Sequence, residues 1–390
     1  MSEILARIRV HETAGIRRFL YPLTAYVTLA PDVDISRLRL ESIQGDPIPV
    51  QLVPWHEGEH RLDFAVSLDP MQENTDFLLR AGGEAAVVPD PLHLTHQAGN
   101  KLQSVQKRFQ VTLGPLAEIC DVVYDKVPHL TEPEFRIDFP AGVRRPDRED
   151  KMFKRGLHTA EQTRADLNVD EVEIGGGHLS AWSRTKGVYN DGCPAEMASE
   201  ITACKSWVTL NYRLEQPKPG EIVYFYLPLG SNFAVRPTIR TTFDCGVDGI
   251  YGHANHFGAF LNWFAPAEVY DPIRWEIGRN HVYDDRLGNL SPIDYVGTTS
   301  EAEFQQQRWF HLVNGTQAVA VAITKMPLAW QSLTMDLRHN IRIKFTLAET
   351  ITGPAEFGVC YHFLNDVPAI AAATNPQSIL LPPVVEVLPV

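Results

Sequence analysis

Hydrophobic and polar residues follow the two-residue period of β-strands along most of the chain, and the clearest pattern lies in residues 304–325. Two apolar runs there, 309–313 and 318–323, flank Asn314-Gly315, a pair that favours the positive φ angles of a tight hairpin turn. The second run has no polar alternation, which indicates a strand that is covered on both faces. The sequence therefore predicts a central hairpin within large stacked sheets.

Other β-prone runs precede and follow this hairpin, with hardly a convincing helical period among them. Before about Gly83 the runs are short and separated by Pro-Asp, Gly-Asp and Glu-Gly turn signals, whereas later runs lengthen. The 390 residues also exceed the ~250–300 at which one hydrophobic core stops growing. We therefore predict an all-β protein with a small N-terminal β-domain (1–83), a linker (84–100), a large β-sandwich (101–365) and an extended C-terminal tail (366–390).

Composition and charge narrow the classes of partner. Apolar residues make up 44% of the chain and charged residues 21%, as in ordinary globular proteins. The net charge of −13 has the wrong sign for binding nucleic acid or an anionic membrane, which both require a basic surface. We expect neither partner.

The N-terminal residues and the cysteines indicate the compartment. Charges at Glu3, Arg7 and Arg9 interrupt what would be the apolar part of a signal peptide, and no run reaches the ~18 apolar residues of a membrane span. Five cysteines without a C-x-x-C pair indicate free thiols. The expected location is the cytoplasm.

Two local motifs carry a resemblance to a known group of proteins. Arg308-Trp309 with the 318–323 strand is similar to a recurring hairpin in the β-region of alpha-mannosidases, and residues 363–368 resemble the closing segment of that region. The order of a small and a large β-domain also resembles carbohydrate-active enzymes with the galactose-mutarotase-like supersandwich, among them alpha-mannosidases and polysaccharide lyases. The resemblance implies a large β-supersandwich preceded by a small β-domain, and a small carbohydrate as ligand. The mannosidase catalytic barrel has no counterpart here, so mannosidase activity is not implied.

Aldose 1-epimerases share the supersandwich and carry an Asn-His motif followed by aromatics. This chain has Asn255-His256-Phe257, and it has the later Gly358-Val359-Cys360. The position that matches the catalytic glutamate of those enzymes is His362, so sugar epimerisation by their mechanism is not expected.

Residues 251–286 hold an unusual density of chemically active side chains. Alternation in a strand over 273–278 would place Arg274 and Glu276 on the face opposite three apolar residues. We interpret the segment as one side of a sugar cleft, because aromatic rings stack on pyranose faces and arginine holds a carboxylate through its planar fork. The candidate catalytic residues are His256, His281, Tyr283 and Glu276, and the candidate substrate-binding residues are Arg274, Arg279, Trp263, Asn255, His253 and His311.

A uronate lyase would use this set of residues. Arg274 or Arg279 would neutralise the carboxylate, His256 or His281 would remove the adjacent proton, and Tyr283 would protonate the leaving oxygen. We expect no cofactor. A divalent metal at His253 and His256, completed by His281 or Glu276, is the alternative use of these histidines.

Two functional classes stay open. The first is a carbohydrate-active enzyme acting on a sugar or oligosaccharide, with a uronate-type lyase as its specific form. The second is a non-catalytic β-module that binds carbohydrate or assembles, including with copies of itself as a homo-oligomer, since a fold does not determine chemistry.

Overall fold

The structure, a computed structural model, describes residues 3–56, 58–97, 101–106, 108–130, 167–219, 350–365 and 378–389, together with ten strands, β17 to β26, between residues 222 and 347. Strands dominate the described residues, and the all-β prediction is confirmed. Within the described residues no helix is long and apolar enough to cross a bilayer.

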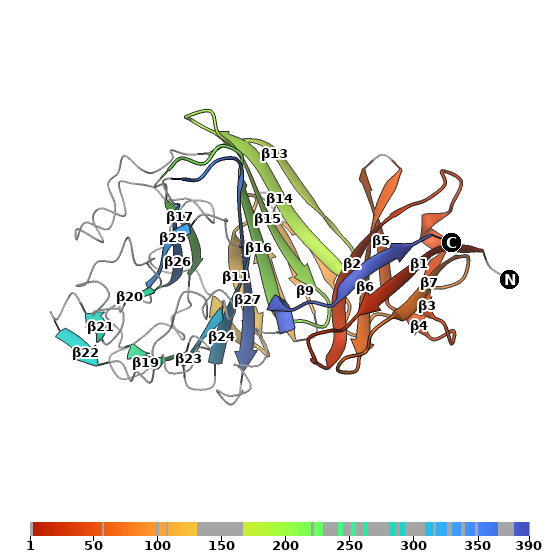
Figure 1. Cartoon of the computed structure of the whole chain (residues 1–390), viewed down its shortest axis with the longest axis horizontal. Coiled ribbons are helices and arrows are strands. Elements are labelled where there is room, and N and C mark those ends of the chain that lie inside the picture. Colours follow the sequence, from red (N-terminus) through yellow and green to blue (C-terminus); the bar gives the residue numbers. More distant parts are fainter. Residues whose placement is uncertain are drawn as a thin grey trace.

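Two sheets and one short 3-10 helix build the N-terminal part of the molecule, on the right in Figure 1. The first sheet has the order β28 (Val384–Leu388), β1 (Ile4–His11), β7 (Thr75–Ala81), β3 (Leu38–Ser42) and β4 (Pro47–Ile48), and the helix η1 (Ile35–Arg37) precedes β3. The second has the order β2 (Arg18–Thr28), β6 (Glu59–Leu68) and β5 (Val50–His56). Their inner faces share one hydrophobic core, which includes Ile8, Leu40, Leu62 and Phe64.

The C-terminal segment closes this N-terminal domain. Strand β28 pairs antiparallel with β1 at the edge of its sheet. Arg18, which is buried, donates from Nε to Glu12 Oε2 at 2.5 Å and from its terminal nitrogens to the carbonyl oxygens of Ser378, at 2.7 Å, and Leu381. Burial would raise the pKa of Glu12, but bonds from Arg18 and from backbone amides more than offset this and lower it. The ion pair therefore ties distant segments together.

The remainder of the chain forms a large assembly of sheets. A nine-stranded sheet has the order β13 (Leu167–Gly176), β14 (Ser180–Tyr189), β15 (Pro194–Thr202), β16 (Trp207–Leu214), β27 (Ala355–Asn365), β24 (Gln317–Lys325), β23 (Trp309–Asn314), β18 (Thr241–Asp244) and β19 (Tyr251–Ala254). A five-stranded sheet has the order β12 (Val127–Leu130), β11 (Ile119–Tyr124), β10 (Phe109–Leu113), β9 (Lys101–Val105) and β8 (His93–Gln97).

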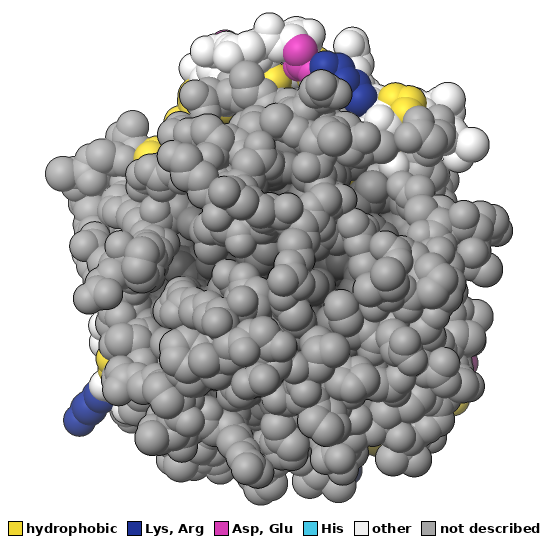
Figure 2. Space-filling model, turned by 90° about the vertical axis from the view of Figure 1, so that its left-hand side faces the viewer, with side chains coloured by type: hydrophobic (Ala, Val, Ile, Leu, Met, Phe, Trp, Pro, Cys, Tyr) yellow, Lys and Arg dark blue, Asp and Glu magenta, His cyan; other side chains and the backbone are white. Residues whose placement is uncertain are grey.

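Two smaller sheets lie at the other end of the molecule in Figure 1. One has the order β17 (Ile222–Pro228), β26 (Asn340–Leu347), β25 (Trp330–Asp336) and β20 (Phe260–Trp263), and the other pairs β21 (His281–Asp284) with β22 (Asn289–Pro292). Figure 2 views this end, and the described side chains visible at its rim include hydrophobic, basic and acidic ones.

The predicted central hairpin is confirmed as a pair of adjacent strands. Strands β23 and β24 pair antiparallel and their last pair is Asn314 with Gln317, and residues 315–316 between them lie outside the described residues. Strand β24 is covered on both faces, as its unbroken apolar pattern predicted: Val321 belongs to one core and Ala322 to the other. The predicted linker, 84–100, contributes β8, and the predicted tail, 366–390, contributes β28.

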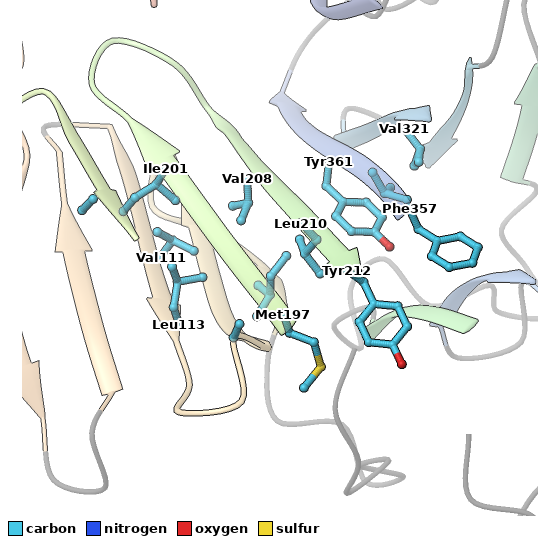
Figure 3. Close-up of a cluster of buried hydrophobic side chains, with 14 of the residues drawn as sticks. Val111, Leu113, Met197, Ile201, Val208, Leu210, Tyr212, Val321, Phe357 and Tyr361 are labelled. Atoms are coloured by element: carbon cyan, nitrogen blue, oxygen red, sulfur yellow. The ribbon is translucent and has the colours of Figure 1, made fainter. Parts of the chain in front are cut away.

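The two faces of the nine-stranded sheet differ in chemistry. Figure 3 shows one hydrophobic core, to which Val208, Leu210, Phe357 and Tyr361 on one face of this sheet belong together with Val111 of the five-stranded sheet. The opposite face carries the alternate residues of the same strands, many of them polar, and it meets the N-terminal domain. Because alternate residues of a strand point to opposite faces, the same strands build both a dry core and a polar surface.

Candidate functional site

A buried polar seam joins the N-terminal domain to the nine-stranded sheet. Asp63 of β6 accepts at Oδ1 from Arg61 Nε, at 2.8 Å, and from Thr24 Oγ1, at 2.7 Å. Its Oδ2 accepts from the hydroxyl of Ser180, the first residue of β14. Oδ2 of Asp63 thus links the two domains, whereas Oδ1 is bonded within the N-terminal domain.

Gln51 of β5 completes this seam. Its Oε1 accepts from the backbone N–H of Leu179 at 2.8 Å, and its Nε2 donates to the carbonyl oxygen of Ser180 at 3.1 Å. A Cβ on Gly177 would lie 2.6 Å from Oε1 of Gln51, so a larger residue at this position would displace the Gln51 amide from the seam.

A pocket of about 300 Å³ lies beside the seam, between the N-terminal domain and the polar face of the nine-stranded sheet. This volume is at the lower end of the range for small-molecule sites. The lining combines acids (Asp63, Glu200), one base (Lys325), hydroxyl and amide groups (Thr24, Ser180, Thr202, Thr209, Asn211, Thr324), aromatic rings (Tyr21, Phe64, Trp207) and apolar groups (Pro22, Leu23, Leu179, Cys360, Ile379).

Glu200 on β15 is the acid of this pocket with unused hydrogen-bonding capacity. Its Oε1 accepts from a terminal nitrogen of Arg61, whereas within the described residues its Oε2 has no partner. The side chain is 29% exposed. Burial raises the pKa of Glu200, against the opposing charge of Arg61, so its carboxyl group holds a proton to a higher pH than usual. Glu200 can therefore accept a hydrogen bond from a ligand or donate a proton to one.

Tyr21 and Trp207 form an aromatic wall of the pocket. Their ring centroids lie 6.0 Å apart in an edge-on arrangement. Lys205 lies behind this wall, with Nζ 5.3 Å from the centre of the Trp207 ring and donating to the carbonyl oxygen of Phe19 at 2.8 Å. Burial lowers the pKa of Lys205 to about 8. Burial also raises the pKa of Cys360 to about 12, so this thiol of the lining stays protonated and is a poor nucleophile.

His362 lies next to the aromatic wall on β27. Its ring is 5.7 Å from that of Trp207, and its Nδ1 is buried without a hydrogen-bond partner among the described residues. Burial, followed by the charge of Lys205, lowers the pKa of His362 to about 3, so the imidazole is neutral at physiological pH. His362, which stands where the sequence motif of aldose 1-epimerases has its glutamate, is thus uncharged.

The structure describes only some of the predicted site residues. Asn255, His256, Arg274, Glu276 and Arg279 lie outside the described residues. The backbones of the others are placed on four strands: His253 on β19, Trp263 on β20, His281 and Tyr283 on β21, and His311 on β23.

Strand pairing brings part of this set together. Strand β21 contacts both β19 and β20, so the strands of His253, Trp263 and Tyr283 are neighbours. In the nine-stranded sheet, His311 pairs with Ala320 and with Asp244.

A row of directly paired residues across four neighbouring strands runs from Trp207 in the pocket wall to His311 of the hairpin. Trp207 pairs with His362, His362 with Ala320, and Ala320 with His311. Directly paired residues share a face of a sheet, so His311 belongs to the face that carries the pocket.

The acids of the pocket, Asp63 and Glu200, are not among the site residues predicted from the sequence. Asp63 interrupts an apolar strand, Leu62 to Leu68, and an acid isolated in this way is a signal of a buried polar role. Glu200 lies on the polar side of the alternation in β15, whose other side is buried. The alternation shows on which face of the strand Glu200 lies, but it does not show which part of the chain packs against that face.

Among the described residues no group of three or more His, Cys, Asp or Glu side chains is arranged to hold a metal ion. The alternative metal site includes His256, which is not among them, so that site stays a prediction.

Comparison with known proteins gives a likeness of fold. No protein-family model matches the chain. No curated protein matches it either. An alpha-mannosidase from Enterococcus faecalis V583 matches with a TM-score of 0.53 and 9% identity, over 98% of this chain and 46% of that one. A glycosyl hydrolase family 38 protein from Enterococcus faecalis matches with a TM-score of 0.52 and 8% identity, over 98% and 47%.

The chain thus spans about half the length of these two solved structures. A galactose 1-epimerase from Lactobacillus acidophilus NCFM also matches, over 72% of this chain and all of that one, but its TM-score of 0.37, at 10% identity, carries no argument. The chain thus shares the fold of about half of each of these two structures, an all-β arrangement of stacked sheets, and the predicted fold-level likeness to alpha-mannosidases is confirmed.

Proposed function

We propose that this protein binds a carbohydrate in the pocket between its N-terminal domain and the nine-stranded sheet. The observation that carries the proposal is the lining: it combines an aromatic wall, Tyr21 and Trp207, with hydroxyl and amide groups and with Oε2 of Glu200, which has no partner among the described residues. Sugars present apolar C–H faces and a rim of hydroxyl groups, and this lining offers a partner for each. The names of the two similar structures, an alpha-mannosidase and a glycosyl hydrolase, support the same ligand class.

Isothermal titration calorimetry with mannose, galactose, glucose, glucuronate, galacturonate and their disaccharides tests the proposal. We expect at least one of these sugars to bind, and Glu200→Gln to weaken its binding about twofold to tenfold, because a hydrogen bond between neutral groups contributes about 0.5–1.5 kcal/mol. Glu171→Gln, which changes an exposed acid paired with Lys186, is the matched control. Binding that is absent for every sugar, or that is equal in Glu200→Gln and the wild type, contradicts the proposal.

We further propose a separate catalytic site on residues 251–286, where a sugar is transformed in the uronate-lyase manner set out above. The contact of β21 with β19 and β20 supports this candidate, because it groups the strands of His281, Tyr283, His253 and Trp263. Arg274 or Arg279 would hold the carboxylate, and His256 or His281 would remove the proton.

Elimination by a uronate lyase leaves an unsaturated product that absorbs ultraviolet light, so turnover of galacturonate and glucuronate oligosaccharides is measured directly. Tyr283→Phe should abolish turnover and leave binding in calorimetry intact. If the wild type binds these oligosaccharides without turning any of them over, the chain is a binding module.

A further inference from the structure

A second group of aromatic side chains, outside the pocket lining, lies on the face of the three-stranded sheet that meets β14. Tyr26 of β2 is 45% exposed, and its ring centroid lies 5.6 Å from that of Trp55 on β5, with 50° between the planes. Trp55 is half-buried. An exposed tyrosine beside a half-buried indole leaves apolar ring surface open to solvent.

Strand β14 supplies the opposite side of this group. The guanidinium carbon of Arg184 lies 4.6 Å from the centre of the Trp55 ring, which fixes the indole from one side. Arg184 is also paired with Glu173 and Glu196, each at 3.2 Å. Charged groups able to donate to and accept from hydroxyls thus border the rings.

Arg61 connects this group to the pocket. Its guanidinium carbon lies 6.0 Å from the Trp55 ring centre and 5.1 Å from that of Trp182, and the same guanidinium donates to Glu200 in the pocket lining. Tyr26 and Arg61 are also direct partners in the pairing of β2 with β6. Pocket and aromatic group therefore lie on either side of one buried arginine.

We infer that the surface formed by Tyr26, Trp55 and Arg184 is a second carbohydrate subsite, which binds a neighbouring unit of an oligosaccharide whose end unit occupies the pocket. This inference rests on the proposed function and gives it a substrate class, an oligosaccharide of at least two units. The exposed ring of Tyr26 stacks on the C–H face of the second unit, and Arg184 with its paired acids binds the hydroxyl rim. Because Arg61 contacts both Trp55 and Glu200 of the pocket, the second unit of a sugar bound in the pocket is the ligand that this surface suits.

The test measures affinity against chain length. Mannose, mannobiose and mannotriose, and galacturonate with its dimer and trimer, are titrated into the wild type and into Tyr26→Ala. The wild type should bind dimers about twofold to tenfold more tightly than monomers, the range expected for one aromatic stacking contact. Tyr26→Ala should bind the monomer as the wild type does and lose the gain with length, whereas Tyr26→Phe should keep it.

Ile43→Ala, which changes a residue that is 59% exposed, is the matched surface control. Trp55→Ala gives a second reading of the same subsite, provided that its urea midpoint matches that of the wild type. Wild-type affinity that is independent of length, or a gain that survives in Tyr26→Ala, overturns the subsite while the pocket stands. If the wild type binds no sugar of any length, the proposed function fails and the subsite fails with it.

Discussion

Two clusters of charged residues each join segments that are far apart in the chain, and they differ in how completely their polar atoms are satisfied. In the cluster of Glu12 and Arg18, one carboxylate oxygen accepts from backbone amides, the other accepts from the arginine, and the arginine also binds two carbonyl oxygens. In the cluster of Arg61, Asp63 and Glu200, Asp63 is equally saturated, but Glu200 keeps one oxygen without a partner within the described residues. Saturation marks a structural ion pair, whereas spare capacity beside a pocket marks a group available to a ligand.

The largest effect is expected when the saturated cluster is broken. Arg18→Met leaves the buried carboxylate of Glu12 uncompensated, so the free energy of unfolding should fall by about 3–5 kcal/mol. Urea denaturation followed by tryptophan fluorescence measures this. Arg17→Met is the adjacent control: its side chain is 77% exposed in a surface pair with Asp69, and its removal should change stability by about 0–1 kcal/mol. Equal losses of stability in Arg18→Met and Arg17→Met would refute the assignment of Arg18 and Glu12 as a stabilising buried ion pair.

A smaller loss is expected at the saturated half of the pocket cluster. Ser180→Ala removes the hydroxyl that donates to Asp63 and should lower the free energy of unfolding by about 1–3 kcal/mol, because Asp63 is buried. The same urea experiment applies, with Ser36→Ala at an exposed position as control. A loss no larger than that of the control would mean that the seam contributes little to stability.

The pH dependence of stability separates the two glutamates. The pKa of Glu12 is lowered from 4.5, so its contribution is present above that pH and is lost as pH falls through the folded value. The pKa of Glu200 is raised from 4.5, so its carboxyl favours folding while protonated, and that contribution is lost as pH rises through the folded value. Between about pH 3 and 7, Glu12→Gln should remove part of the rise of stability with pH, and Glu200→Gln should make that rise steeper. Urea midpoints at several pH values measure both effects. If the two variants changed the slope of stability against pH in the same direction, the opposite roles assigned to Glu12 and Glu200 would be contradicted.

The smallest effect is expected in an exposed cluster of similar composition. Arg213 donates to Glu215 at 2.6 Å and to Glu356 at 2.5 Å, and all three side chains are more than 40% exposed. Arg213→Gln should therefore change the free energy of unfolding by about 0–1 kcal/mol. A loss near that of Arg18→Met would show that burial does not set the difference between the clusters.

The fold followed from local patterns, but much of the pocket did not. Alternation and the turn at Asn314-Gly315 were enough to predict the hairpin, since a hairpin joins strands that are adjacent in sequence. The pocket joins Asp63, Ser180, Glu200 and Cys360, which come from four strands far apart in the chain. Period-2 alternation gives the face on which each residue lies and not the strand that faces it. The part of the predicted site around Arg274 lies outside the described residues and stays a prediction.

The pairing of β28 with β1 has a consequence for the order in which the molecule matures. As the chain leaves the ribosome, β1 emerges before β28, and its outer hydrogen-bonding edge stays open until residues 384–388 arrive. An open strand edge is a template for association with other chains. The small β-domain therefore reaches its finished sheet only after residues 384–388 have been made, and a nascent chain stalled before that point should be the species most prone to aggregate.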